Sequence, residues 1–188
     1  MDALILTGGE SRRMGRDKKD LLFENKTFLN RIKESLAPLG RIYISTRDGE
    51  GEGIISDIYK DCGPLGGIHA GLRKLDSQEI FVLACDMPLI QWSHVKDLID
   101  RYYEKKKPSI FVPKTTRVHP LCGIYSKEIL KDLEDCLEKR DLRLQKFLSS
   151  QSTYYFQVHD PSFIRALEAN INTPDAYERL LGGQDESR

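Results

Sequence analysis

The chain has 188 residues, with 29 basic and 29 acidic side chains, four cysteines and 39% hydrophobic residues. This length favours a single domain whose core needs no disulfide or structural metal. Zero formal net charge argues against a nucleic-acid coat or a polybasic membrane binder, and the composition also excludes a disordered acidic chain.

The start of the chain predicts neither a signal peptide nor a membrane span, because only a short apolar run, 3–6, follows Asp2. The cysteines are scattered and form no CxxC pair, which is typical of buried thiols and not of a zinc site. We therefore expect a cytoplasmic protein that contacts neither nucleic acid nor membrane. The cysteines are Cys62, Cys85, Cys122 and Cys136.

Strands and helices are predicted to alternate along the chain. A hairpin or turn is expected at 21–28, and a helix that begins at 28 is closed by Pro38 and Gly40. The segment that starts at Gly63 (GPLGG) reads as a glycine-rich helix. Apolar runs predict strands at 3–7, 41–45, 54–55, 79–85, 109–113 and 154–158. Further helices are predicted at 93–103, 127–137, 142–148 and after 174.

This alternation predicts an α/β fold, a Rossmann-like three-layer sandwich with a mostly parallel sheet. We expect one domain over 1–181 and a disordered tail at 182–188. Ligands of such sheets bind at the carboxyl ends of the strands, so Gly8, Gly9, Asp57 and Asp86 should converge on one crevice.

The segment 6–18 (LTGGESRRMGRDK) is the most informative part of the chain. Its glycines let backbone N–H groups approach an anion, and its arginines and lysine supply positive charge. It is neither a Walker A loop nor GxGxxG. On composition alone it could also be a solvated basic turn, but its position after a buried strand favours a phosphate site.

Asp86 follows the strongest apolar run, and Pro88 ends the strand just beyond it. A carboxylate held at a strand end suits Mg²⁺, which takes one or two carboxylates together with substrate phosphates. The alternative is that Asp86 caps a turn or the helix that follows. The remaining histidines, His69, His94 and His159, show no motif spacing and read as structural or surface residues.

The segment 6–18 resembles the triphosphate loop of the molybdenum cofactor guanylyltransferase family, within the wider nucleotidyltransferase superfamily. The resemblance continues in family order at 63–68 (GPLGGI), 85–88 (CDMP), 119–121 (HPL) and 170–174 (NINTP). The chain departs from the family pattern where Thr7 replaces a usual alanine, at Lys19-Asp20, and at Asn25, where a turn glycine is common. None of these changes removes a charged functional group.

The resemblance implies a nucleotidyltransferase fold and transfer of GMP from GTP to the phosphate of (molybdenum-)molybdopterin, with Mg²⁺ as cofactor. Lys18, Arg13 and Asp86 would be catalytic, and Asp86 would hold the metal. His119, Arg143, Asn170 and Asn172 resemble the part of the family that receives molybdopterin. The implied GTP contacts are Leu6, Thr7, Gly8, Gly9, Lys18, Asp57, Gly63 and Asp86.

Several alternatives stay open at the level of sequence. Asp61 competes with Asp57 as the nucleotide contact, and Gly63–Gly67 could lie under the guanine or ribose or could simply start a helix at Pro64. Another cofactor or sugar nucleotidyltransferase that uses CTP would share the first loop and Asp86. A non-catalytic nucleotide-binding adaptor of cofactor assembly is the rival from another class. A molybdopterin-delivery or acceptor protein is the expected partner besides the two substrates.

Overall fold

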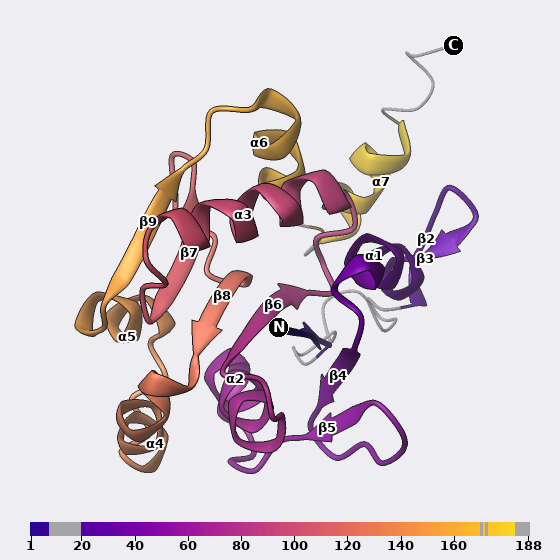
Figure 1. Cartoon of the computed structure of the whole chain (residues 1–188). Helices are drawn as coiled ribbons and strands as arrows, with labels where there is room; N and C mark the ends of the chain where they lie inside the picture. Colours follow the sequence, from indigo (N-terminus) through magenta and orange to yellow (C-terminus); the bar gives the residue numbers. More distant parts are fainter. Residues whose placement is uncertain (8–19, 170, 172, 183–188) are drawn as a thin grey trace.

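The computed structural model describes residues 1–7, 20–169, 171 and 173–182 (Figure 1). Its centre is a seven-stranded sheet in the order β5-β4-β1-β6-β8-β7-β9. Only β8 runs antiparallel to its two neighbours, and the other pairs in the sheet are parallel. The expected mostly parallel α/β sheet is therefore confirmed. The strands are β1 (Asp2–Leu6), β4 (Ile42–Thr46), β5 (Ile54–Ser56), β6 (Glu79–Ala84), β7 (Ile110–Lys114), β8 (Cys122–Ser126) and β9 (Thr153–Gln157).

Helices cover both faces of the sheet, which makes the three layers (Figure 1). One face packs against α1, α3 and α6 through side chains such as Ile32 and Val95. The other packs against α2, α4 and α5 through side chains such as Leu65 and Leu133. The described helices are α1 (Phe28–Leu36), α2 (Gly63–Lys74), α3 (Trp92–Glu104), α4 (Leu130–Glu138), α5 (Leu144–Ser150), α6 (Pro161–Glu168) and α7 (Pro174–Gly182), with short 3₁₀ turns at Ala37–Leu39 and Lys127–Ile129.

The central strand β1 shows why this stretch of sequence must be a buried strand. Its side chains alternate between the two layers, with Ala3 and Ile5 in one hydrophobic cluster and Leu4 and Leu6 in the other. A strand with period two that buries both faces has to be apolar throughout. Asp2, buried at the start of β1, is neutralised by Arg41 at 2.9 Å.

A small hairpin of β2 (Leu22–Phe23) and β3 (Lys26–Thr27) precedes α1. Its two turn residues, Glu24 and Asn25, have positive φ angles of 50° and 61°. Two positive φ angles in a two-residue turn are the geometry that matches the twist of a hairpin. The expectation of a hairpin or turn at 21–28 is confirmed.

The helix α7 packs against this hairpin and the start of α1. Tyr177 donates its hydroxyl to the Leu22 carbonyl at 2.7 Å and meets the Phe28 ring edge-on, with centroids 6.0 Å apart. Ile171 is buried in the same cluster. The end of the described chain therefore lies beside the segment that leads into α1.

The structure contains two elements, β8 and α6, that the sequence analysis did not predict. The strand β8 contains Gly123, which interrupts its apolar pattern, and α6 is short. The helix α6 nevertheless carries a readable start, because Asp160 accepts from the Phe163 amide at 2.7 Å and Pro161 follows it. None of the described helices is both long enough and apolar enough to cross a lipid bilayer.

Candidate active site

The carboxyl ends of four neighbouring parallel strands meet at one edge of the sheet. Thr7, which follows β1, donates its hydroxyl to the Ser45 carbonyl of β4 at 2.7 Å. Asp57 follows β5, and its amide donates to Thr46 at 3.0 Å. Between β1 and β6 the chain changes direction across the sheet, and such a switch point is where open α/β sheets bind ligands.

Asp86 stands at this switch point, two residues beyond the end of β6. The Cys85 amide donates to the Leu6 carbonyl at 3.0 Å, so the residue before Asp86 is paired to the end of β1. The Asp86 main-chain carbonyl accepts from the Ile171 amide at 3.1 Å. Ile171 of the NINTP segment is thus bound to the Asp86 turn, whereas Asn170 and Asn172 lie outside the described residues.

Asp57 is half-buried, and its carboxylate faces the end of β4. The Ser45 hydroxyl lies 3.3 Å from one of its oxygens. Burial raises the pKa of Asp57, and the hydrogen bond from Ser45 acts in the opposite direction. Asp61, the competing candidate, is exposed and ion-paired with Arg47 at 3.0 Å.

The glycines of α2 bring this helix close to the strand ends. A Cβ atom on Gly67 would lie 2.7 Å from Ser45 Oγ and 2.8 Å from Leu6 Cδ2, and one on Gly66 would lie 2.9 Å from the Tyr59 carbonyl. At Gly66 and Gly67 a side chain is therefore excluded by the protein itself, and the expected helix start at this segment is confirmed by α2. The place of the segment under the guanine or ribose stays a prediction. In this segment only a Cβ on Gly63 would meet no described atom within 4 Å, and the φ of Gly63 is +58°.

The HPL segment, which contains the predicted acceptor residue His119, lies at the same edge of the sheet. The Ala84 amide donates to the Leu121 carbonyl at 2.8 Å, so the HPL segment adjoins the end of β6. His119 is only 4% exposed, and its Nε2 lies 2.8 Å from Thr115 Oγ1. Burial lowers the pKa of His119. Its ring is thus part of the packed loop, with little surface left for a ligand.

Arg143 is exposed and precedes α5. Its guanidinium makes two hydrogen bonds to Asp141, at 2.8 and 3.1 Å, and Lys146 reaches the same carboxylate at 2.5 Å. These bonds hold the pKa of Asp141 well below its usual range. A phosphate that bound Arg143 would have to share its guanidinium with this carboxylate or displace the carboxylate from it.

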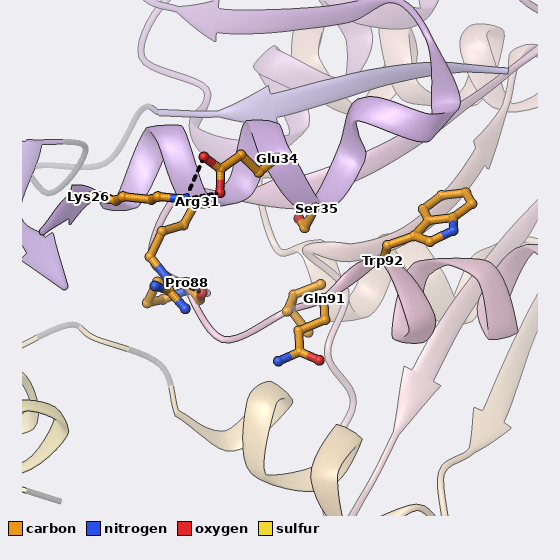
Figure 2. A pocket seen from close by; sticks show the side chains of 8 residues that line it. Lys26, Arg31, Glu34, Ser35, Pro88, Gln91 and Trp92 are labelled. Carbon is orange, nitrogen blue, oxygen red and sulfur yellow. Dashed lines mark hydrogen bonds and ion pairs between the residues drawn. The ribbon is translucent and has the colours of Figure 1, made fainter. Parts of the chain in front are cut away.

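A hollow of about 360 Å³ lies beside the Asp86 turn, between α1 and the start of α3 (Figure 2). Lys26 and Glu34 pair across its rim at 2.8 Å, and Arg31 extends toward Pro88. The lining residues are Lys26, Arg31, Glu34, Ser35, Pro88, Ile90, Gln91 and Trp92.

The donor set near Asp86 suits a magnesium ion that is shared with phosphates. Among the residues that the structure describes, no three carboxylate, histidine or cysteine side chains gather closely enough to hold a metal by themselves. Asp86 offers hard carboxylate oxygens at a strand end, and Mg²⁺ commonly takes its other ligands from water and substrate. The residues present therefore fit this ion.

Of the predicted site positions, Leu6 ends β1 and is paired with Ala84 at the end of β6. Thr7 and Asp86 follow these two strand ends, and Asp57 and Gly63 reach the same edge from β5 and α2. Arg13, Lys18, Gly8 and Gly9 lie outside the described residues. Sequence reasoning missed Ser45, which contacts Asp57 and whose carbonyl binds Thr7. A polar residue near the end of a predicted parallel strand was the signal that could have found it.

The sequence matches the family model described as "MobA-like NTP transferase domain" over residues 3–154. It is 30% identical over 185 residues to a "Probable molybdenum cofactor guanylyltransferase" of Flavobacterium johnsoniae, covering 96% of each chain. It is 31% identical to a "Molybdenum cofactor guanylyltransferase" of Syntrophotalea carbinolica, covering 94% of this chain and 89% of that protein. The crystal structure of a molybdopterin-guanine dinucleotide biosynthesis protein A from Archaeoglobus fulgidus superposes with a TM-score of 0.84, at 25% identity, and covers 99% of this chain and 100% of that one.

Proposed function

Because the chain belongs to the MobA-like NTP transferase domain family, we propose that it transfers GMP from GTP to the terminal phosphate of molybdopterin, releasing pyrophosphate. The observation that carries this proposal is that Thr7, Asp57 and Asp86 follow β1, β5 and β6 at the carboxyl-end edge of the sheet, with Asp86 beside the switch point. Two relatives similar over nearly their whole length bear the name of this activity.

The reaction needs no protein nucleophile. An oxygen of the acceptor phosphate attacks the α-phosphorus of GTP, the bond from that phosphorus to the bridging oxygen breaks, and pyrophosphate leaves with the bond electrons. The protein therefore has to hold two anions in line and offset their charge. Bound Mg²⁺ would supply positive charge on the phosphate oxygens.

Each predicted residue has a place in this scheme. The backbone at Leu6, Thr7, Gly8 and Gly9 would hold the phosphates, and Lys18 and Arg13 would offset the charge of the triphosphate and of the leaving pyrophosphate. Gly63, beside which the described residues leave space, would make room for the nucleoside. Asp57 would bind the nucleotide through its carboxylate, and Asp86 would hold the metal.

On the acceptor side, Arg143 is exposed and remains the basic residue proposed to meet the molybdopterin phosphate, together with Asn170 and Asn172. His119 is proposed to shape this region through its packing with Thr115, since its ring is buried. We also propose that the protein works in the reducing cytoplasm, which suits its free cysteines, and that it meets a molybdopterin-delivery or acceptor protein there.

The test is turnover of GTP and molybdopterin with Mg²⁺, followed by pyrophosphate release. Asp86→Asn should abolish turnover in a folded protein, because the substitution keeps the size of the side chain at an edge of the sheet. Asp61→Asn is the matched control and should keep activity, since Asp61 is exposed and paired with Arg47. Full activity of Asp86→Asn would contradict the assignment.

The same experiments separate the rival functions. Calorimetry with GTP, CTP and ATP would reveal a CTP-dependent transferase by its base preference. Binding of GTP without any pyrophosphate release in the presence of molybdopterin would identify the non-catalytic adaptor. Lys18→Ala should weaken GTP binding, and an unchanged affinity would contradict the proposed role of this lysine in binding the triphosphate.

A further inference from the structure

We propose that Arg31 is a positioning residue, which fixes the turn 86–90 against the β2–β3 hairpin and thereby sets the position of Asp86. This inference rests on the proposed function, because it assigns Asp86 to the metal. Arg31 itself reaches neither substrate nor metal in this scheme, and it acts through the main chain of the turn.

From the middle of α1, Arg31 contacts two separate segments, the turn 86–90 and the β2–β3 hairpin. Its Nε donates to the Pro88 carbonyl at 3.3 Å, and its Nη1 donates to Glu24 at 2.6 Å. The guanidinium carbon lies 4.7 Å from the centroid of the Phe23 ring. The side chain is only 20% exposed, so it is held between these partners, as Figure 2 shows for its approach to Pro88.

Holding the Pro88 carbonyl restricts the position of Asp86, because the two residues are separated only by Met87. The proline ring fixes its own φ angle, which leaves this stretch little freedom once its carbonyl is held. Ile171 holds the first residue of the turn through the Asp86 carbonyl, at 3.1 Å. The turn is thus held at its start by the C-terminal segment and at its middle by α1.

The second partner of Arg31 belongs to the hairpin that follows Lys18 in the chain. Glu24 is a turn residue of this hairpin, and Phe23 is buried in the cluster beneath it. One guanidinium therefore links the Asp86 turn to the hairpin that comes after the predicted phosphate loop. In a two-anion reaction, the spacing of metal and cations is what the protein has to maintain.

Only an arginine can make these contacts together. Its planar fork presents several donors in fixed directions and stacks on an aromatic face. A lysine at this position would keep the charge but could not bind Pro88 and Glu24 with two separate N–H groups in the same geometry. Lys26 offers a matched control, because it lines the same hollow and its ammonium pairs with Glu34, on α1 and away from the turn.

The experiment compares Arg31→Gln and Arg31→Lys with Lys26→Gln in the full chain. Hydrogen exchange of the Met87 and Ile90 amides, which bond to Ala84 and Met87 at 3.3 and 3.2 Å, reports on the turn without any ligand. The Mn²⁺ affinity of the protein bound to a non-hydrolysable GTP analogue, measured by electron paramagnetic resonance, reports on the metal. The Mg²⁺ concentration for half-maximal turnover gives the third readout.

We expect Arg31→Gln to speed exchange of the two amides about tenfold, and to weaken Mn²⁺ binding and raise the Mg²⁺ requirement about fivefold, in line with loss of a charged hydrogen bond. Arg31→Lys should show smaller shifts in the same direction, and Lys26→Gln should match the wild type in all three. Wild-type exchange and metal affinity in Arg31→Gln would overturn the inference. A lowered melting temperature with unchanged metal affinity would overturn it as well, because it would reveal a merely structural role.

Failure of the proposed function has a different signature. A wild-type protein that transfers no GMP would contradict the proposed function, whereas amide exchange in the ligand-free variants would still decide whether Arg31 holds the turn. A wild-type protein that turns over normally, beside an Arg31→Gln variant with the same metal dependence, would contradict this inference alone.

Discussion

The Ser45 hydroxyl lies 3.3 Å from a carboxylate oxygen of Asp57, where β4 and β5 end side by side. Half-burial raises the pKa of Asp57, while this hydrogen bond favours the ionised form and lowers it. Since the net direction is upward, burial outweighs the hydrogen bond. The two residues together set how readily this corner of the site carries a negative charge.

Ser45→Ala should raise the pKa of Asp57 further, because it removes the hydrogen bond and leaves the burial. A carboxyl group with a raised pKa binds its proton more tightly in the folded state, so the stability it contributes is lost as pH rises through the folded pKa. We expect this loss to begin above about pH 3.9, the ordinary value for an aspartate, and to extend to higher pH in Ser45→Ala. Carbon-13 NMR titration of the carboxyl group checks the pKa, with Asp57→Asn as the reference that lacks this titration. An unchanged pKa would contradict the contact.

Gly67→Ala should destabilise the protein by about 1–3 kcal/mol, the usual effect of overpacking. The new methyl group would stand 2.7 Å from Ser45 Oγ and 2.8 Å from Leu6 Cδ2, inside the contact distance of both. Chemical denaturation measures the free energy of unfolding. Gly182→Ala is the control, because its Cβ would meet no described atom within 4 Å. Equal stability of the two variants would mean that α2 can move away from β1 at little cost.

Tyr177→Phe should lower the free energy of unfolding by about 1 kcal/mol, since it removes the hydrogen bond to the Leu22 carbonyl and keeps the ring against Phe28. Hydrogen exchange should show the loss first in the amides of α7. Tyr103→Phe provides the comparison, because Tyr103 is exposed and should tolerate the change. If both variants behave like the wild type, the docking of α7 on the hairpin does not depend on this bond.

His94 should make the protein less stable as pH falls below about 6.5, the ordinary value for a histidine. Its Nδ1 accepts from the Gln91 amide at 3.2 Å, which an imidazolium cannot do, and burial lowers its pKa. The unfolded chain therefore binds more protons in this range, and stability is lost as pH falls through it. Thermal melts from pH 5 to 8 should show a smaller acid loss in His94→Gln than in wild type, whereas His159→Gln, at an exposed position, should follow the wild type. Equal acid sensitivity of wild type and His94→Gln would mean that protonation of His94 is not the cause of the acid loss of stability.

The elements of the fold follow from local pattern more readily than their arrangement. Apolar runs are enough to place β1 and β6, and a helical period closed by Pro38 and Gly40 is enough to place α1. The short β8 escapes this reasoning because Gly123 interrupts its pattern. Its antiparallel insertion between β6 and β7 is set by pairing with distant strands, which no local period encodes.

In the candidate site, too, single residues can be predicted from local sequence, whereas the contacts between them cannot. A strand end followed by an acid is visible in sequence, so Asp57 and Asp86 are predictable positions. The contacts that orient them join Thr7 to Ser45 across 38 residues and Arg31 to Pro88 across 57, and they exist only once the register of the sheet is set. The glycines of α2 are easily recognised in the sequence, but the sequence does not show what lies beside them. Packing decides whether that space holds a ligand or a serine hydroxyl.

Because the Asp86 carbonyl is hydrogen-bonded to the Ile171 amide, completion of the site depends on a residue that is synthesised late. The strands β1, β4, β5 and β6 are all present once residue 84 has left the ribosome, so these four parallel strands can assemble early. The Ile171 amide arrives only after β9 and α6 have been synthesised. An unfinished chain could then build most of the sheet without completing the turn that presents Asp86. Synthesis itself would thus delay activity until nearly the last helix.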